Sequence, residues 1–452
     1  MGELSILLLS VFYFITGILY IGYEIYGTYK HKQIRAIAYV RFLYLIIYGF
    51  LPAIVHFHMY STGEVVFRIT YTQNGITQLY ILYVLSVVAY AFINLGYKIS
   101  RSENTGSAKI NIVTSINKLF IASSLILIFG FSSFLMWTKV FGSPFGVIEY
   151  ASLLRSGLTP FYNPWSFMKR FATLMSFSAF IYFAILLNMN KGVSLRKIIV
   201  FFLLMFSSFW SVVYLLSNDG RMSFIYFFVT FILYYIYYKQ NFVRKFNIQK
   251  TLINVGTWLV LAFIAMSLSD WIMYFLRFGE AREAEISLNI FELIRNELGY
   301  TILSGQTALT ALDQGQAGSR ILIELLSMIF AFLPSRFTPD NIETLFSYNT
   351  VLVGNTNGTV PTDLLSFCIY VLGFIGVIII PIILGFLVRK IDNAFKKYKG
   401  IFYYDMLFII VSLYCARFIA YADLANFVHV VLFIILGHFI IKIINKIRLS
   451  VS

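Results

Sequence analysis

The sequence predicts an all-α polytopic membrane protein with about eleven transmembrane helices and one large external loop that contains amphipathic helices. Of its 452 residues, 59% are apolar and only 12% are charged, whereas soluble domains carry roughly 25% charged residues. Apolar stretches long enough to cross a bilayer as a helix, about 20 residues each, recur along the chain. A transmembrane β-barrel would instead show shorter segments of alternating polarity.

The apolar stretches divide the chain into three parts. Residues 1–269 hold the first eight expected spans, residues 270–361 form the external loop, and residues 362–452 hold the last three. The first stretch lacks a basic leading region and a small-residue cleavage site, so we expect a retained span rather than a signal peptide. The expected spans are 4–23, 36–56, 77–97, 119–138, 171–190, 198–217, 222–238, 251–269, 362–388, 402–421 and 426–444.

Basic residues between the spans predict the orientation, because short cytoplasmic loops collect lysine and arginine. The loops and tail on one side carry 22 of the 35 basic residues, and 16 of these 22 are lysines. We expect that side to be cytoplasmic, which places the N-terminus and the loop 270–361 outside and the C-terminus inside. The same rule accounts for most of the net charge of +15, so we expect no nucleic-acid partner.

On the expected outer side, arginine takes the place of lysine. Arginine presents a planar fork that binds phosphate or carboxylate through two hydrogen bonds, and it keeps its charge when partly desolvated. Each outer arginine could pair with an acid of the loop itself, such as Glu280 or Glu283, but the set as a whole favours an anionic substrate. The set consists of Arg68, Arg155, Arg170, Arg221, Arg277, Arg282, Arg295, Arg320 and Arg336, accompanied by Lys139 and Lys169.

A short turn, Ser217 to Arg221, joins the sixth and seventh spans on the outer side. Its Asn-Asp-Gly core is typical of turns, and we expect it to hold Asp219 and Arg221 at the mouth of the bundle. Side chains that snorkel at the ends of spans would give the same pattern. A loop this short needs no arginine, however, which favours a functional role.

Two arginines fall inside expected spans. Arg417 lies near the outer end of the tenth span, where a charge is costly and usually faces a polar interior. It could pair with Asp423, Asp219 or Asp363, or with a substrate phosphate. Arg41 lies near the cytoplasmic start of the second span, and we expect its side chain to snorkel to the interface.

The loop 270–361 has internal order. Residues 281–298 and 320–333 are predicted to form amphipathic helices, the second of which could also be re-entrant. Residues 300–314, between them, are small and polar.

The last part of the loop, Gly354 to Asp363, is rich in Gly, Asn and Thr. Such side chains and backbone amides are good hydrogen-bonding partners for sugars. We therefore expect Asn355, Asn357 and Thr362 to contact a sugar.

No motif of a familiar soluble enzyme occurs in the chain, neither a P-loop nor a dinucleotide fingerprint nor a nucleophile elbow. We expect no cofactor. His56 and His58 lack a cluster of further ligands, so we expect no metal site. Cys368 and Cys415 lie within expected spans and are expected to be small core residues.

Three short elements carry a resemblance to a known family. Ser217 to Arg221 is similar to that family's Ser-Gly-x-Arg turn, and Leu333 to Arg336 is similar to its Ile-Pro-Arg element. Gly354 to Asp363, followed by a glycine-containing span, looks like its Gly-rich Pro-Thr segment. Together with the span count and the large late loop, these elements resemble the Wzy-type O-antigen and capsular oligosaccharide repeat unit polymerases, with a GT-C-like fold. Asp363 stands where the family often has a glutamate.

The resemblance implies that a growing glycan is transferred from a polyprenyl diphosphate to a sugar hydroxyl of the next lipid-linked unit. The reaction would occur at the outer face of the bacterial cytoplasmic membrane. Arginines would hold the diphosphate and stabilise the leaving group, and a carboxylate would orient or deprotonate the acceptor hydroxyl. The implied partners are the lipid-linked oligosaccharide, the bilayer and a chain-length regulator protein.

The residues that we assign to this chemistry are the outer arginines and nearby acids. The candidate catalytic residues are Asp363 first, then Asp219, with Arg221. The candidate diphosphate ligands are Arg221, Arg336 and Arg417 first, then Arg277 and Arg320.

Other activities stay open. An O-antigen ligase would use the same donor but transfer the finished glycan to a lipid A core. A flippase for lipid-linked oligosaccharides would line a central cavity with its charges, whereas the charges here gather on the outer side. A glycosyltransferase that uses a polyprenyl monophosphate would resemble its relatives in an acidic pair in the first outer loop, where this chain has only Glu64.

Overall fold

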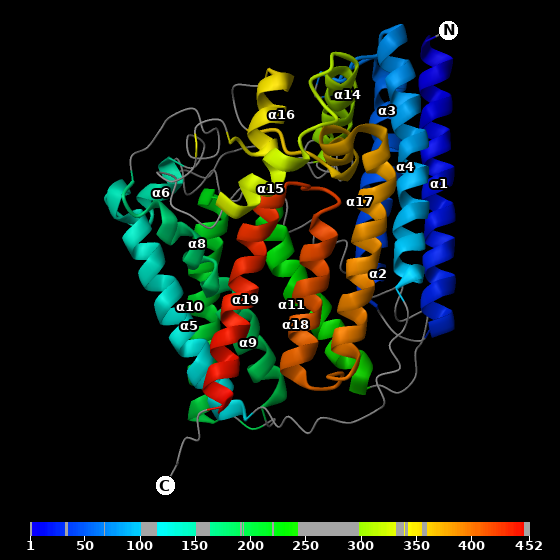
Figure 1. The fold of residues 1–452 in the computed structure, drawn as a ribbon. Helices are drawn as coiled ribbons and strands as arrows, with labels where there is room; N and C mark the ends of the chain where they lie inside the picture. Colours follow the sequence, from blue (N-terminus) through cyan, green and yellow to red (C-terminus); the bar gives the residue numbers. More distant parts are fainter. Residues whose placement is uncertain are drawn as a thin grey trace.

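A computed structural model describes most of the chain as a bundle of helices (Figure 1). The described residues are 2–31, 35–66, 68–100, 115–150, 163–189, 192, 194–218, 221–242, 298–330, 339, 342–354 and 359–446. Within these residues every regular element is helical.

The helices have the following bounds. They are α1 Gly2–His31, α2 Ala36–Leu45, α3 Leu51–Thr62, α4 Gln73–Ile99, α5 Ile116–Thr138, α6 Gly146–Glu149, α8 Lys169–Ala172, α9 Leu174–Asn188, α10 Leu195–Asn218, α11 Arg221–Phe242, α14 Tyr300–Asp313, α15 Ile321–Phe330, α16 Leu345–Val353, α17 Leu364–Lys396, α18 Phe402–Arg417 and α19 Leu424–Lys446. A π-helical turn, Ile46–Phe50, joins α2 to α3, and short 3-10 turns lie at Lys139–Phe141 and Ser166–Met168.

Eight described helices are long and apolar enough to cross a membrane, which confirms a polytopic helical membrane protein. They correspond to the first six expected spans, the ninth and the eleventh. The seventh forms a shorter apolar helix, Met222–Tyr238. The tenth forms α18, which has only 16 residues and is buried along most of its length. The eighth, 251–269, lies outside the described residues, so the total of eleven stays a prediction.

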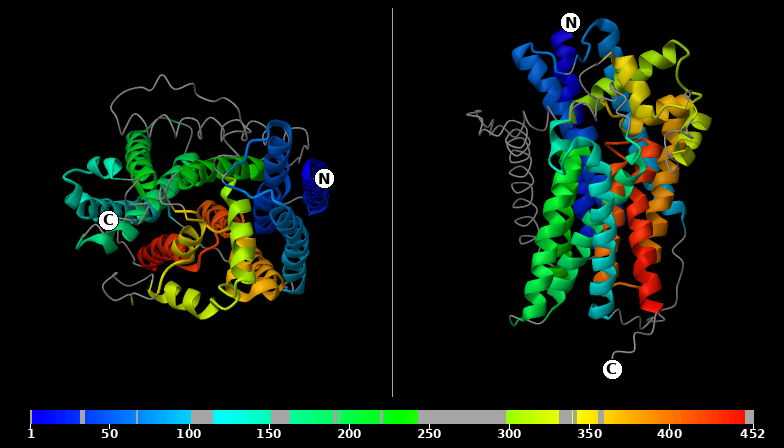
Figure 2. Two further views of the ribbon diagram at one scale, coloured as in Figure 1. Left: turned by 90° about the horizontal axis from the view of Figure 1, so that it is seen from above. Right: turned by 90° about the vertical axis from the view of Figure 1, so that its left-hand side faces the viewer.

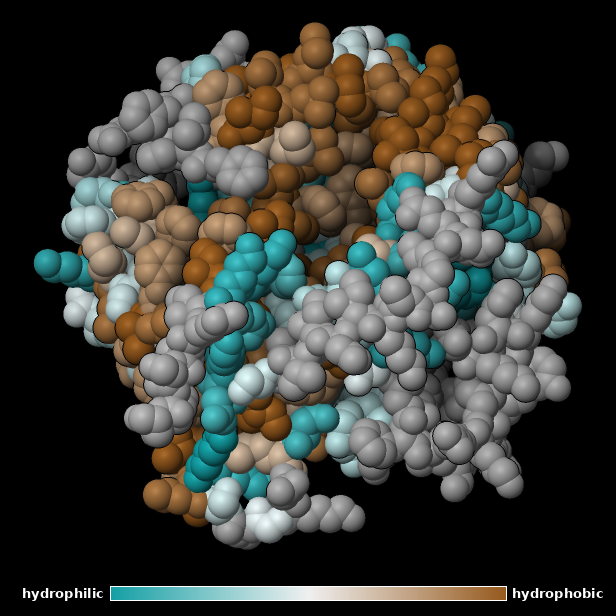
Figure 3. Space-filling model, turned by 60° about the horizontal axis from the view of Figure 1, so that its bottom comes forward, coloured by the Kyte–Doolittle hydropathy of each residue, from teal (hydrophilic) through white to brown (hydrophobic). Residues whose placement is uncertain are grey.

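The long helices stand side by side, and α1 begins at the opposite end of the bundle from the end of α19 (Figures 1 and 2). Figure 3 looks obliquely at the end of the bundle opposite to the start of α1. It shows a side of the bundle that is covered largely by apolar side chains. Such a surface is suited to lipid, because acyl chains offer no hydrogen bonds to polar groups. The assignment of one end to the cytoplasm stays a prediction.

The described parts of the loop 270–361 form three helices, α14, α15 and α16, which gather at the end of the bundle where α1 begins (Figure 1). The predicted amphipathic helix at 320–333 is present as α15. The predicted helix at 281–298 falls almost wholly outside the described residues.

Residues 300–314 were expected only to be small and polar, and the structure forms α14 from Tyr300–Asp313. The Gln306 amide holds this helix to the segment before α4, because it accepts from the Thr70 N–H at 3.0 Å and donates to the Thr70 carbonyl at 2.9 Å. Ile302, Ala308 and Leu309 are buried. Tertiary packing therefore stabilises a helix in a stretch for which no helix was predicted.

The helices α4 and α17 pack with their backbones in close approach, and glycine permits it. A β-carbon at Gly96 would lie 2.1 Å from the Ile382 carbonyl oxygen, and one at Gly385 would lie 2.0 Å from the Ile93 carbonyl oxygen. Small residues let helix backbones approach in membranes, where dispersion rather than the hydrophobic effect holds helices together. This contact anchors α17, whose first residue follows the end of the loop.

Arg41 differs from its expected behaviour. Its guanidinium does not snorkel but is buried between α1, α2 and α4, where it pairs with Glu24 at 2.9 Å. Its Nε also donates to the Asn94 side-chain oxygen at 2.9 Å. An acid and an amide on neighbouring helices thus satisfy the charge inside the bundle. Arg41 therefore does not need to reach the membrane interface.

The α4–α17 contact gives a test of the fold. Gly385→Val should destabilise the protein by about 1–3 kcal/mol or more, because the new side chain must displace backbone rather than a flexible side chain. The melting temperature of the detergent-solubilised protein would measure this loss. Gly22→Val is the matched control, since a β-carbon there meets nothing within 4 Å. Equal effects of the two substitutions would contradict the close approach.

Candidate anion-binding site

Arg417 ends α18 at the end of the bundle where α14, α15 and α16 gather, and its side chain is only 8% exposed. The guanidinium carbon lies 5.7 Å from the ring centre of Tyr226 and 5.3 Å from that of Tyr421. Among the described residues, no acid lies within ion-pair distance of it. Two aromatic faces thus stabilise the cation without neutralising its charge.

Asp423 does not pair with Arg417, because it caps two helices at once. One carboxylate oxygen accepts from the Asn426 N–H at 2.8 Å in the first turn of α19, and the other accepts from the Phe346 N–H at 3.1 Å in the first turn of α16. The side chain is fully buried. Burial raises the pKa of Asp423, while these backbone donors oppose the shift.

Asp363 also caps a helix and is 1% exposed. Its carboxylate accepts from the Leu365 N–H at 3.2 Å and the Ser366 N–H at 3.4 Å, in the first turn of α17. The hydroxyl groups of Tyr48 and Ser366 donate to it as well. Burial raises the pKa of Asp363, and the hydrogen bonds lower it. This geometry gives Asp363 a structural role, and its expected catalytic role stays a prediction.

Thr362, which was expected to contact a sugar, points its hydroxyl into the protein. It donates to the Ala422 carbonyl at 2.6 Å, and the Ala422 N–H donates to the Thr362 carbonyl at 2.8 Å. The Leu364 N–H donates to the Ile419 carbonyl at 3.0 Å. The start of α17 is therefore paired with the turn between α18 and α19, and this pairing leaves the Thr362 hydroxyl engaged.

A buried hydrogen-bond network around the Asn349 amide holds the end of the loop. The sequence gave no signal for this network. The Asn349 side chain in α16 donates to the Ser304 hydroxyl and to the Val360 carbonyl, both at 2.9 Å, and accepts from the Tyr370 hydroxyl at 2.8 Å. Ser304 in turn donates to the Pro361 carbonyl at 2.7 Å. These bonds hold the end of the loop against α14, α16 and α17.

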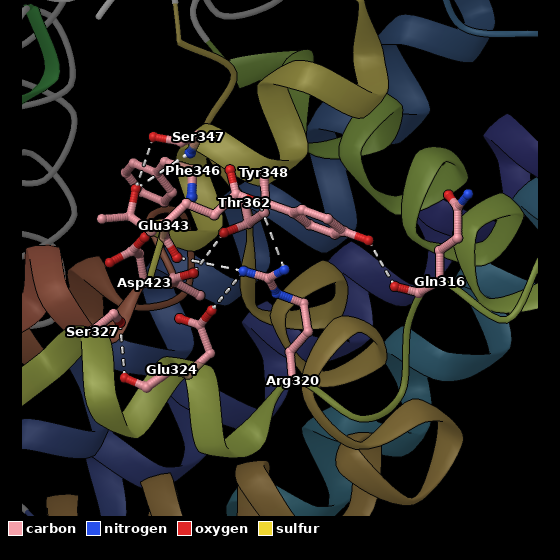
Figure 4. Close-up of polar contacts among 12 residues, drawn as sticks. Gln316, Arg320, Glu324, Ser327, Glu343, Phe346, Ser347, Tyr348, Thr362 and Asp423 are labelled. Carbon is pink, nitrogen blue, oxygen red and sulfur yellow. Dashed lines mark hydrogen bonds and ion pairs between the residues drawn. The ribbon is translucent and has the colours of Figure 1, made fainter. Parts of the chain in front are cut away.

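Arg320 lies in a second charged group, next to Asp423 (Figure 4). Its guanidinium lies 3.6 Å from the Glu324 carboxylate, 3.9 Å from that of Glu343, and 3.8 Å from the ring centre of Tyr348. Arg320 therefore already lies beside two acids of its own loop. For Arg320, the structure thus agrees with the alternative that an outer arginine pairs with an acid of the loop itself.

Glu324 is the most unusual acid of the described residues. It is fully buried, and neither of its carboxylate oxygens has a hydrogen-bond partner. Burial raises the pKa of Glu324 to about 8, the charge of Asp423 adds to the shift, and Arg320 opposes it. At neutral pH the carboxyl group is therefore largely protonated. A lone acid on an otherwise apolar helix was the only sequence signal for it.

The remaining candidates fall at the margin of the described residues or beyond it. Arg221 begins α11, the helix that also carries Tyr226, so the start of α11 lies about 1.4 turns from a residue that contacts Arg417. Asp219, Arg277, Arg336, Asn355 and Asn357 lie outside the described residues.

The described residues hold no group of three or more His, Cys, Asp or Glu side chains placed to bind a metal ion. Comparisons of the chain with family models, curated proteins and solved structures give no match.

Glu324 gives a prediction of pH dependence. A carboxyl whose pKa is higher in the folded state than in the unfolded chain favours folding at low pH, and that contribution is lost as the pH rises toward the folded pKa. Glu324→Gln should therefore gain melting temperature relative to the wild type between pH 5 and pH 8. Glu343→Gln, at a side chain that is 43% exposed, is the control and should follow the wild type. If the melting temperatures of the wild type and Glu324→Gln changed with pH in parallel, a raised pKa of Glu324 would be refuted.

Proposed function

We propose that the protein is a glycosyltransferase that joins polyprenyl-diphosphate-linked oligosaccharide units into a polysaccharide at the outer face of the bacterial cytoplasmic membrane. The observation that carries the proposal is Arg417, a buried guanidinium held between two tyrosine rings with no acid beside it among the described residues. Burying a charge is costly unless a counter-charge is supplied. A diphosphate would supply that counter-charge from the substrate.

The neighbouring acids support this assignment because each of them already has other partners. Asp423 and Asp363 accept backbone hydrogen bonds at helix starts, and Glu324 and Glu343 lie beside Arg320. Arg41, deep in the bundle, does have an acid partner. The contrast between the two buried arginines favours a binding role for Arg417 and a structural role for Arg41.

In the proposed reaction, a hydroxyl oxygen of the acceptor sugar forms a bond to the anomeric carbon of the donor glycan. The bond between that carbon and the diphosphate oxygen breaks, and the polyprenyl diphosphate leaves with the electron pair. Arg417 and Arg221 would stabilise the charge that grows on the leaving diphosphate. A carboxylate takes the hydroxyl proton. Because Asp363 is fixed as a cap, we assign that step first to Asp219.

Arg417 tests the proposal. Arg417→Gln should reduce polymer formation by roughly 100-fold or more, as removal of one donor to a developing oxyanion does. Arg417→Lys should recover part of the activity, because it restores the charge but not the planar fork. Polymer length on a polysaccharide gel is the measurement. Arg196→Gln, an arginine on the expected cytoplasmic side that packs on Phe120, should leave polymer unchanged.

A binding measurement separates the site from the reaction. Polyprenyl diphosphate should raise the melting temperature of the wild-type protein, because a ligand that binds only the folded state stabilises it. Arg417→Gln should show a much smaller rise. If Arg417→Gln made polymer of wild-type length and its melting temperature rose as much as that of the wild type, Arg417 would not be part of the binding site. In the purified system, a ladder formed from donor lipid alone supports a polymerase, whereas a requirement for lipid A core would make the enzyme a ligase.

A further inference from the structure

The helix α15 has its polarity reversed relative to a helix on the surface of a soluble protein. Its solvent-accessible face is apolar, and its buried face carries an acid and a serine. Glu324 is 0% exposed and Ser327 is 4% exposed. The outward face consists of Leu322, Leu325, Leu326 and Ile329, which are 70%, 40%, 43% and 54% exposed.

The two faces follow from helical spacing. At 3.6 residues per turn, positions 322, 325, 326 and 329 fall on one stripe, while 320, 324 and 327 fall on the opposite side. The inward side is held by the packing of α15 on α19 and α17, and Glu324 lies there 3.6 Å from the Arg320 guanidinium. The apolar stripe therefore faces outward, and turning it inward would expose the buried Glu324 and Ser327.

The position of α15 in the bundle indicates which surroundings this stripe meets. Figures 1 and 2 place α15 at the periphery, across the ends of α17 and α19 rather than parallel to them. Both neighbours are long enough to span the membrane and expose apolar side chains of their own, such as Phe374 and Ile375 on α17 and Ile435 on α19. The stripe on α15 continues that apolar perimeter at the level of the first turn of α19, next to its cap Asp423.

We infer that α15 lies in the plane of the membrane, seated in the leaflet at that end of the bundle, with its Leu322–Ile329 stripe against lipid acyl chains. Amphipathic helices that lie in the interface bury one apolar face among acyl chains, and α15 has such a face. The inward Glu324 supports this placement, because a lone acid on a lipid-facing helix must turn toward the protein. The inference does not rest on the proposed function, only on the membrane character of the bundle.

Spin labelling in liposomes tests the placement. Single cysteines are introduced at Leu322, Ile329, Ser327 and Gln314 in a Cys368→Ala, Cys415→Ala background that elutes as a monodisperse species. The accessibility of the attached nitroxide to oxygen, which concentrates in lipid, is compared with its accessibility to a water-soluble nickel chelate. Gln314 is an exposed polar residue after α14, and Ser327 lies on the buried side of α15.

Labels at 322 and 329 should be relaxed several-fold more strongly by oxygen than by the chelate. The label at 314 should show the reverse order, and the label at 327 should be shielded from both. Chelate accessibility at 322 equal to that at 314 would overturn the inference, because the stripe would then face water. Shielding from both reagents at 322 and 329 would also overturn it, because protein, from this chain or another copy, would then cover the stripe. The measurement needs no activity, so its failure is distinct from failure of the proposed reaction.

Discussion

The double cap made by Asp423 is the interaction on which one end of the bundle depends. A single buried carboxylate accepts N–H groups from the first turns of α19 and α16, and helix starts leave such donors unsatisfied unless a side chain supplies the acceptor. The pairing of Thr362 with Ala422 then fixes the start of α17 against the same turn. These buried hydrogen bonds thereby attach α16 to the start of α19, and the start of α17 to the turn between α18 and α19.

That use of acids has an electrostatic consequence for the arginines. Asp423 and Asp363 are committed to backbone donors, and Glu324 and Glu343 lie beside Arg320. Arg417 is left with aromatic faces alone among the described residues. A purely structural role would be better served by an acid, as at Arg41 and Glu24. The local distribution of charge therefore fits a site completed by an anion from outside the chain.

Hydropathy predicts the spans well, because the bilayer imposes length and apolarity on every helix that crosses it. The exceptions have physical reasons. The helix α18 is buried among other helices and so can be short, and α14 is helical because of partners such as Thr70 that no local pattern records. Asp363 and Asp423 each precede an apolar run, which is a recognisable N-cap signal. The sequence analysis considered their charge instead, Asp363 as a catalytic acid and Asp423 as a partner of Arg417, and only the structure distinguishes a cap from a free acid.

The position of α15 relates the membrane to the candidate anion site. Glu324 faces Asp423 from the buried side of α15. If the apolar stripe of α15 lies among acyl chains, the turn that carries Asp423 and follows Arg417 lies beside that leaflet, at a depth similar to that of α15. A substrate whose anionic group is attached to a long apolar chain presents its charge at that depth and keeps its chain in lipid. A soluble anion would gain nothing from this arrangement, so the depth of α15 favours a lipid-linked ligand for Arg417 over a free one.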